Sequence, residues 1–163
     1  MSKKYKLTKE TITFQGETLY RIEALNNFSI IKAGQKGGWV ATEKNLRQSG
    51  NCWIGGEAMA TGKARVYGNA FVGEDAVVSD NARVYGNAFV GETAVISDSA
   101  RVYGDAKVIG VVMLNNLVRV YGRSVLDGEI TVNGKTRFLD AKVMLNDVVI
   151  TGGSKISGIM LSN

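Results

Sequence analysis

Residues 64–81 read ARVYGNAFVGEDAVVSDN and residues 82–99 read ARVYGNAFVGETAVISDS, so the chain contains two nearly identical eighteen-residue segments in succession. Within each segment an apolar residue recurs at every sixth position, which divides the segment into three hexads. A fixed period identifies a repeat architecture more reliably than local secondary-structure propensity does. The pattern therefore predicts a stack of equivalent structural units.

The apolar series continues on both sides of these segments, without an insertion, from Ile54 to Ile156. Its members are Ile54, Ala60, Val66, Val72, Val78, Val84, Val90, Ile96, Val102, Val108, Leu114, Val120, Leu126, Val132, Phe138, Met144, Ile150 and Ile156. We expect all of these side chains to point into one continuous core.

Each hexad, in the form A-x-V-x-G-N, has the features of a short strand followed by a corner. Its alanine and valine are two residues apart and point to the same side, because side chains alternate along a strand. Glycine and asparagine follow, and these residues adopt a positive φ at the least cost. Three strands and three corners close one coil, and parallel pairing stacks successive coils about 4.8 Å apart. The sequence thus predicts an all-β solenoid with eighteen residues per coil.

These hexads resemble those of the hexapeptide-repeat proteins, whose fold is the left-handed parallel β-helix. The left-handed winding and a homotrimeric assembly are what this resemblance implies. Residues 4–51, with TLYRIEAL at 18–25, KGGWV at 36–40 and GNCW at 50–53, are similar to a leader found in phage, prophage and bacterial hexapeptide-repeat proteins of unassigned role. The leader therefore implies a phage or prophage origin.

We expect three segments along the chain: a cap over residues 1–45, a left-handed β-helix over residues 46–158 and a tail over residues 159–163. In the cap, 11–14 and 19–24 predict a β-hairpin around the turn-prone residues 15–17. With Trp39 packed beneath it, this hairpin would cover the unpaired edge of the first coil. In the tail, Ile159, Met160 and Leu161 either fold back as a lid or meet a partner subunit.

One outward column of the predicted prism is basic and aromatic. The candidate ligand-binding residues are Arg65, Arg83, Arg101, Arg119 and Arg137, together with Tyr67, Tyr85, Tyr103 and Tyr121. Arg47 and Lys155 extend the series of cations at its two ends. Guanidinium groups about 4.8 Å apart repel each other by roughly 1 kcal/mol in water, so something should offset this repulsion.

Two explanations of the basic column are open. The arginines could be neutralised locally, by stacking on the tyrosine rings or by reaching acidic corners such as Asp80 and Asp98. Alternatively, arginine beside aromatic rings suits an anionic ligand such as a nucleotide or a single strand of nucleic acid.

The other two outward columns are apolar and suit a subunit interface. The candidate interface residues are Trp53, Phe71 and Phe89 on one face and Met59, Val77, Val95 and Met113 on another. A soluble monomer seldom leaves continuous apolar patches of this kind in water. A homotrimer that packs two of these columns around its threefold axis would bury them and leave the arginines outside.

Charge and composition bound the possible partners. From Leu46 onward twelve basic and eleven acidic residues leave a net charge of +1, and residues 1–45 add the other +4 of the total +5. The lysines at 3, 4, 6 and 9 are typical of a solvated tail rather than a binding arm. No apolar run is long enough to span a membrane and the start lacks the apolar core of a signal peptide, so we expect a cytoplasmic protein with no membrane partner.

The absence of histidine from the sequence argues against catalysis. The resemblance implies acyltransferases that use a histidine base and carbonic anhydrases that hold zinc with three histidines, and this chain can supply neither. The single cysteine, Cys52, excludes a cysteine-based metal cluster and is interpreted as a buried structural thiol. We therefore predict no catalytic residue, no metal and no cofactor.

The sequence favours a non-catalytic, homotrimeric module that binds a nucleotide, a nucleic acid or a host defence complex through the basic column. One alternative is an acyl-coenzyme A-dependent acyltransferase in which Glu92 or Asp98 replaces the histidine base. A second alternative is a purely structural rod whose last coil pairs with a strand of another protein.

Overall fold

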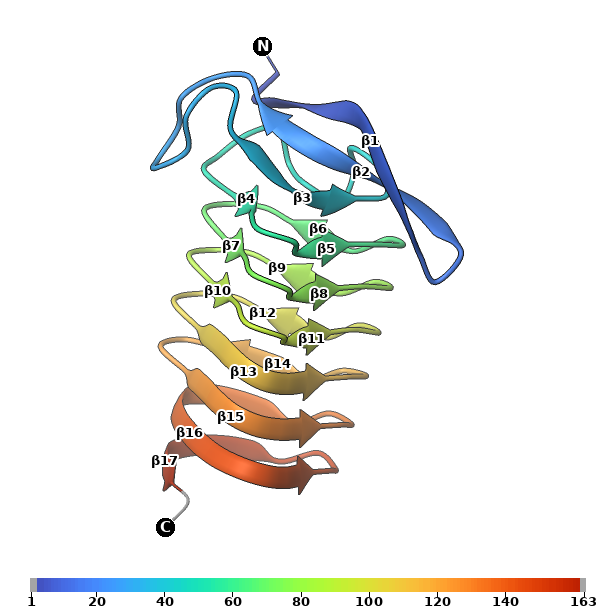
Figure 1. Cartoon of the computed structure of the whole chain (residues 1–163). Helices are drawn as coiled ribbons and strands as arrows, with labels where there is room; N and C mark the ends of the chain where they lie inside the picture. The colour runs from blue at the N-terminus through green and yellow to red at the C-terminus, as the bar shows by residue number, and fades with distance from the viewer. Residues whose placement is uncertain (1–2, 162–163) are drawn as a thin grey trace.

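The computed structural model describes residues 3–161, and within this range every regular element is a β-strand. The chain forms a stack of parallel coils with the N-terminal segment at one end (Figure 1). In Figure 1 the front strands run from left to right and the chain returns behind them as it descends, which is the left-handed sense. The predicted fold, a left-handed β-helix with an N-terminal hairpin, is confirmed.

Three strands precede the regular coils: β1 (Tyr5–Phe14), β2 (Glu17–Ala24) and β3 (Lys36–Val40). The upper coils contain β4 (Trp53–Ile54), β5 (Met59–Ala60), β6 (Arg65–Val66), β7 (Phe71–Val72), β8 (Val77–Val78), β9 (Arg83–Val84), β10 (Phe89–Val90), β11 (Val95–Ile96) and β12 (Arg101–Val102). The lower coils contain β13 (Lys107–Leu114), β14 (Arg119–Tyr121), β15 (Val125–Val132), β16 (Arg137–Ile150) and β17 (Lys155–Leu161).

The coils are stacked in the eighteen-residue register that the repeat predicts. Arg83 pairs with Arg101, Phe71 with Phe89 and Val77 with Val95, each in parallel strands. These pairs define three faces, which we call the arginine face, the phenylalanine face and the valine face. Like residues thus form columns along the axis of the solenoid.

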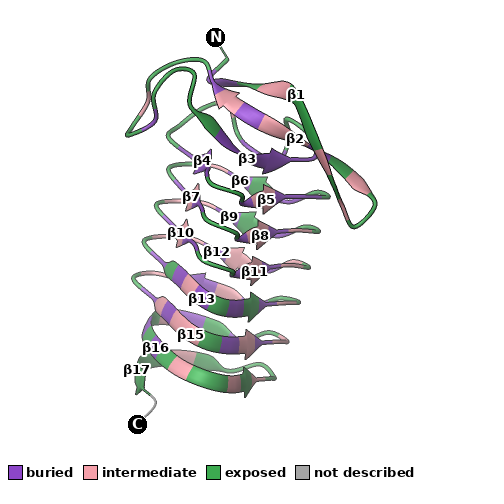
Figure 2. Cartoon of the chain, in the orientation of Figure 1, coloured by how far each residue is buried: buried purple, intermediate pink, exposed green. Residues whose placement is uncertain are grey.

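The inside of the coils is filled by the alanines and β-branched residues of the hexads. Val72, Val78 and Val84, like the alanines at 70, 76 and 82, are fully buried. Figure 2 shows buried residues recurring along the coils. Because the prism is narrow, a small and a larger apolar residue alternate along each strand and fill it.

The cap forms as predicted, with longer strands than the sequence suggested. β1 and β2 pair in antiparallel fashion around Gln15 and Gly16, and β2 pairs with β3. β3 in turn pairs in parallel with β5, so it joins the hairpin to the first coil. Trp39 is buried with Leu19 in a cluster below the hairpin, which confirms its predicted place.

The hexad register slips by one residue in the lower coils, which corrects one part of the prediction. Leu126 pairs with Val143, seventeen residues later, and Val143 is buried where Met144 was expected. Met144 points outward and is 37% exposed. The eighteen-residue spacing is restored after Gly128, which pairs with Leu145. From there β16 has two residues before Val148, whereas β15 has one residue before Ile130, the partner of Val148.

The end of the solenoid is an open edge rather than a lid. β17 pairs in parallel with β16, and its last residues, Ile159 to Leu161, continue the coil. The prediction that they fold back as a lid is wrong. These three side chains are exposed, as Figure 2 shows for the strand as a whole. The rest of the predicted tail, residues 162 and 163, lies outside the described range.

Candidate functional site

The arginine face presents the predicted cations as one continuous column. We use the name arginine column for Arg65, Arg83, Arg101, Arg119 and Arg137. The prediction that Arg47 extends this column is wrong, because Leu46 pairs with Val66 and Arg47 therefore lies level with Tyr67. Parallel pairing places Arg65, Arg83, Arg101, Arg119 and Arg137 in successive coils, and Lys155 follows. Arg65, Arg83 and Arg137 are exposed, and Arg101 and Arg119 are partly buried by their neighbours.

No member of the arginine column has a carboxylate partner within 4.0 Å in residues 3–161. The ion pairs in this range involve other cations: Lys3 with Glu43, Lys6 with Glu23, Arg21 with Glu57, Lys36 with Glu10 and Arg123 with Asp140. Neutralisation by acidic corners, one of the two explanations of the column, is therefore wrong for this part of the chain.

The acidic corners use their carboxylates to bind backbone instead. Asp98 Oδ2 accepts a hydrogen bond from the backbone N–H of Asn116 at 2.8 Å, and Asp80 Oδ2 accepts one from the N–H of Asp98 at 3.3 Å. Both residues are exposed and adopt a positive φ, as does Glu92. These carboxylates hold successive corners together.

The tyrosines of the arginine face stack on each other. The ring centroids of Tyr67, Tyr85, Tyr103 and Tyr121 are 4.8, 4.9 and 5.1 Å apart in turn, and the ring planes are within 4° of parallel. The cation–π contacts in residues 3–161 are those of Lys4 over Phe28 and Arg21 over Trp39. Stacking of the arginine column on the tyrosine rings is therefore also absent from this range.

Burial raises the pKa of the Tyr67 and Tyr103 hydroxyl groups, and the nearby arginines oppose this shift only in part. Both side chains consequently stay neutral at physiological pH, so the tyrosine stack adds no negative charge to the column. The arginine face keeps its positive charge, with the edges of the stacked tyrosine rings beside it.

A basic groove opens at the N-terminal end of the arginine column. Its larger part, of about 640 Å³, is lined by Lys3, Glu43, Lys44, Leu46, Arg47, Gln48, Ser49 and Arg65. Its smaller part, of about 280 Å³, is lined by Lys44, Arg47, Arg65, Val66, Tyr67 and Arg83. Glu43 is the only carboxylate in either lining, and it is bound to Lys3 Nζ at 2.7 Å.

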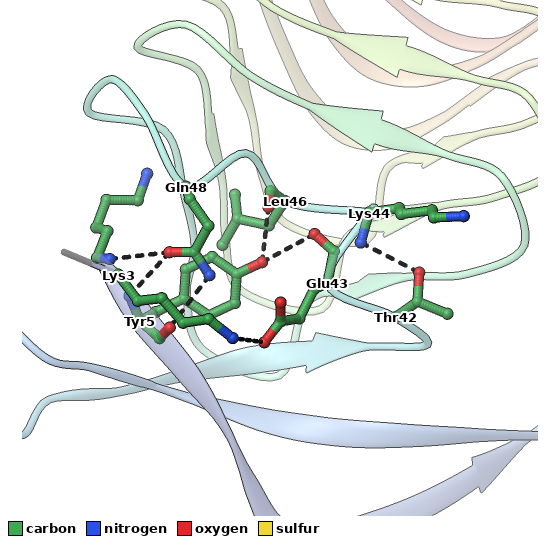
Figure 3. A network of polar contacts seen from close by, with 8 residues as sticks. Lys3, Tyr5, Thr42, Glu43, Lys44, Leu46 and Gln48 are labelled. Atoms are coloured by element: carbon green, nitrogen blue, oxygen red, sulfur yellow. Dashed lines mark hydrogen bonds and ion pairs between the residues drawn. The ribbon is translucent and has the colours of Figure 1, made fainter. Parts of the chain in front are cut away.

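Residues of the leader fix the loop that forms one wall of this groove, as Figure 3 shows. The Tyr5 hydroxyl donates to the backbone carbonyls of Glu43 and Leu46, at 3.1 and 2.6 Å. The Gln48 amide accepts from the backbone N–H groups of Lys4 and Tyr5 and donates to the Tyr5 carbonyl. Lys44 extends its ammonium group away from this network (Figure 3). The groove was not predicted, because the start of β1 and the loop of residues 42–48 are about forty residues apart along the chain and no repeat connects them.

Lys4 differs from the solvated lysine that the sequence suggested. It is buried, and its ammonium group donates to the carbonyl of Cys52 at 2.8 Å and to the Cys52 sulfur at 3.3 Å. Burial lowers the pKa of Lys4 and raises that of Cys52. Cys52 is fully buried, so its interpretation as an interior thiol is confirmed.

Of the predicted interface residues, Trp53 does not lie on a free surface. It is 1% exposed, because Tyr5 and Phe28 of the leader pack edge-on against its ring. The prediction overlooked the leader as the element that covers this end of the phenylalanine face. The remaining members, Phe71, Phe89, Met59, Val77, Val95 and Met113, stay partly or largely accessible. Phe71 and Phe89 stack with a centroid distance of 5.7 Å.

Within residues 3–161 no three side chains of the histidine, cysteine, aspartate or glutamate type come together in a way that could hold a metal ion. The same range has no helix with the length and hydropathy of a membrane span. A scan against models of protein families and a search of curated proteins both gave no match to this chain.

Proposed function

We propose that this chain is a non-catalytic β-solenoid module that binds nucleotides or single-stranded nucleic acid through the arginine column. The observation that carries the proposal is the row of arginines without a carboxylate partner within 4.0 Å in the described residues. A row of like charges has an electrostatic cost, and phosphate groups would offset it.

The arginine column and the end of the tyrosine stack support nucleic acid as the ligand. Arginine forms paired hydrogen bonds with phosphate oxygens, and an aromatic face that no other tyrosine covers, as at Tyr67, can stack with a base of any sequence. The net charge of only +1 from Leu46 onward indicates that attraction is confined to this one face. Binding should consequently be sensitive to salt and to mutation of this face alone.

A titration with a labelled oligonucleotide at about 50 mM and at about 200 mM salt tests the proposal, because phosphate contacts weaken as salt rises. We expect binding that weakens with salt, and a loss of at least tenfold in affinity in the triple variant Arg83→Ala, Arg101→Ala and Arg119→Ala. Arg123→Ala is the matched control, since Arg123 is highly exposed but lies outside the arginine column. Absence of binding at the lower salt concentration, or equal affinity in the triple variant, would contradict the proposal.

We also propose that three copies assemble through the phenylalanine and valine faces, which would leave the arginine column outside. Met113 is 40% exposed, and Phe71, Phe89, Val77 and Val95 form partly exposed apolar columns beside it. The measurement is the mass in solution by light scattering, with three times the 17.5 kDa of one chain as the expected value. A mass of one chain at all concentrations would contradict the trimer.

The resemblance of the leader to phage and prophage proteins supports a role in the cytoplasm of an infected host, where a nucleotide signal or nucleic acid of a defence complex would be the ligand. Plating of phage on a host that carries a nucleotide-dependent defence, with and without this chain, measures such a role. Equal plating in both strains would argue against it.

A further inference from the structure

The tyrosine stack has one covered end and one open end. At its C-terminal end the residue paired with Tyr121 is Leu139, whose side chain continues the column. At the N-terminal end Leu46 pairs with Val66, so Arg47, whose backbone N–H donates to the Val66 carbonyl, occupies the position of a tyrosine in the coil above Tyr67. No ring of the described chain stacks on this side of Tyr67, and Tyr67 lines the basic groove.

Four cations surround the groove at this end of the tyrosine stack. Lys44, Arg47, Arg65 and Arg83 line its smaller part together with Tyr67, and no carboxylate does. A phosphate monoester carries a charge of about −1.5 to −2 at neutral pH, whereas an internal phosphodiester carries a single charge. A terminal phosphate would therefore gain more from this groove than an internal one.

The groove is also held in shape before any ligand arrives. The hydrogen bonds of Tyr5 and Gln48 join the loop of residues 42–48 to the start of β1, as described above (Figure 3). A preformed site binds more tightly because little ordering remains to be done on binding. Arg65 and Tyr67 are two residues apart in one strand region and so point to the same side, which brings a cation and a stacking surface together.

From this geometry we propose that the groove is a terminal-nucleotide site, in which a base stacks on the open face of Tyr67 while Lys44, Arg47 and Arg65 bind the terminal phosphate. This inference rests on the proposed function and adds a defined end point to the arginine column. The ligand class is a nucleotide that carries a phosphate monoester, whether it is free or forms the end of a strand.

Short probes test the site, because they cannot extend along the whole arginine column. The probes are a labelled trinucleotide with a 5′-phosphate, the same trinucleotide with a 5′-hydroxyl, and AMP as a free nucleotide. We expect the phosphorylated trinucleotide to bind at least fivefold more tightly than the hydroxyl form. Tyr67→Leu and Arg47→Ala should each weaken its binding at least fivefold, in line with the loss of one stacked base or one phosphate contact.

Matched variants outside the arginine column and the tyrosine stack are the controls. Arg123→Ala and Tyr20→Leu make the same chemical changes away from the groove and should leave the affinity of the short probes within twofold. The melting temperatures of Tyr67→Leu and Arg47→Ala should stay close to that of the parent chain, which separates a lost contact from a loss of folding.

The two proposals fail in different ways. Long oligonucleotides could bind through the arginine column while the affinity of the short probes depends neither on the 5′-phosphate nor on the Tyr67→Leu change. In that case the terminal site is wrong and the proposed function stands. If neither long nor short probes bind, both are wrong. Binding of AMP as tight as that of the phosphorylated trinucleotide would support the site with a free nucleotide as its ligand, and binding of the trinucleotide alone would support it with a strand end.

Discussion

At the scale of single residues, the corners of the coils use two different solutions to the same backbone requirement. The column of Gly68, Gly86 and Gly104 has positive φ values of 73 or 74°, and each glycine approaches the next one closely. Asp80 and Asp98 have φ values of 59 and 55° but carry a side chain that binds the backbone of the next corner. Glycine is thus required where backbones touch, and an acidic residue suffices where its carboxylate has a backbone N–H to bind.

We predict that Gly86→Ala destabilises the chain more than Gly16→Ala. Both glycines have a positive φ, which costs an alanine about 1–2 kcal/mol. A Cβ at Gly86 would lie 2.8 Å from the backbone nitrogen of Gly104, whereas a Cβ at Gly16 would have nothing within 4 Å. The free energy of unfolding in denaturant measures the difference. Equal losses in the two variants would show that the close approach of the corners has no energetic weight.

We predict that Tyr5→Phe lowers the free energy of unfolding by about 1–2 kcal/mol near pH 7, because two carbonyl groups lose their hydrogen bond. Burial raises the pKa of Tyr5 above its ordinary value. In the unfolded chain the hydroxyl ionises near pH 10, so the stabilisation by Tyr5 is present below that pH and is lost as the pH rises towards the folded-state pKa. The difference in the free energy of unfolding between the parent chain and Tyr5→Phe should therefore decrease above about pH 10.

Denaturant unfolding at a series of pH values checks this prediction. Tyr20→Phe in β2 is the control for the chemical change, because it leaves both Tyr5 hydrogen bonds in place. A difference that stays constant or increases through the alkaline range would contradict the assignment of the buried hydroxyl.

At the scale of elements, the repeat predicts the columns of the coils but does not predict the slip at β16 or the contacts of the N-terminal segment, and the physical reasons differ. A strict eighteen-residue period fixes which residues form a column, so the arginine and tyrosine columns follow from sequence alone. The slip at β16 does not, because Val143 and Met144 are both apolar and the pattern fits either of them. The burial of Trp53 and the basic groove depend on where the leader folds back, and no period connects the leader with the coils.

We predict that Val143→Ala destabilises the chain by about 1–3 kcal/mol, because it removes two carbon atoms from a fully buried side chain. Met144→Ala should cost much less, since its side chain points outward. The comparison of their unfolding transitions tests the register of β16 directly. A larger loss in Met144→Ala would restore the uninterrupted hexad series and overturn the slip.

At the scale of the whole molecule, each coil contacts only the coils above and below it, so the coils are close to interchangeable. Residues 64–81 and 82–99 are nearly identical, and their strands occupy equivalent positions one coil apart. The length of the solenoid is therefore set by the number of coils rather than by a unique packing of the whole chain.

We predict that deletion of residues 82–99 yields a folded solenoid that is one coil shorter, because Asn81 would then be followed by Ala100 in unchanged register. Deletion of residues 82–98 is the matched control. It removes seventeen residues, so one additional residue must be accommodated between two coils, and we expect a lower melting temperature than in the first variant. Circular dichroism and thermal unfolding distinguish the two cases. Equal melting temperatures in the two variants would show that the coils accommodate an additional residue without loss of stability.

The parallel order of the strands also bears on how the chain leaves the ribosome. From β7 onward, every strand pairs with one that lies earlier in the sequence, mostly eighteen residues before it, and the hairpin that caps the first coil comes earliest of all. During translation, each newly emerged coil thus finds its template already synthesised. The protein can be completed in the direction of its own synthesis, coil upon coil, with only the most recent edge exposed to the surroundings at any moment.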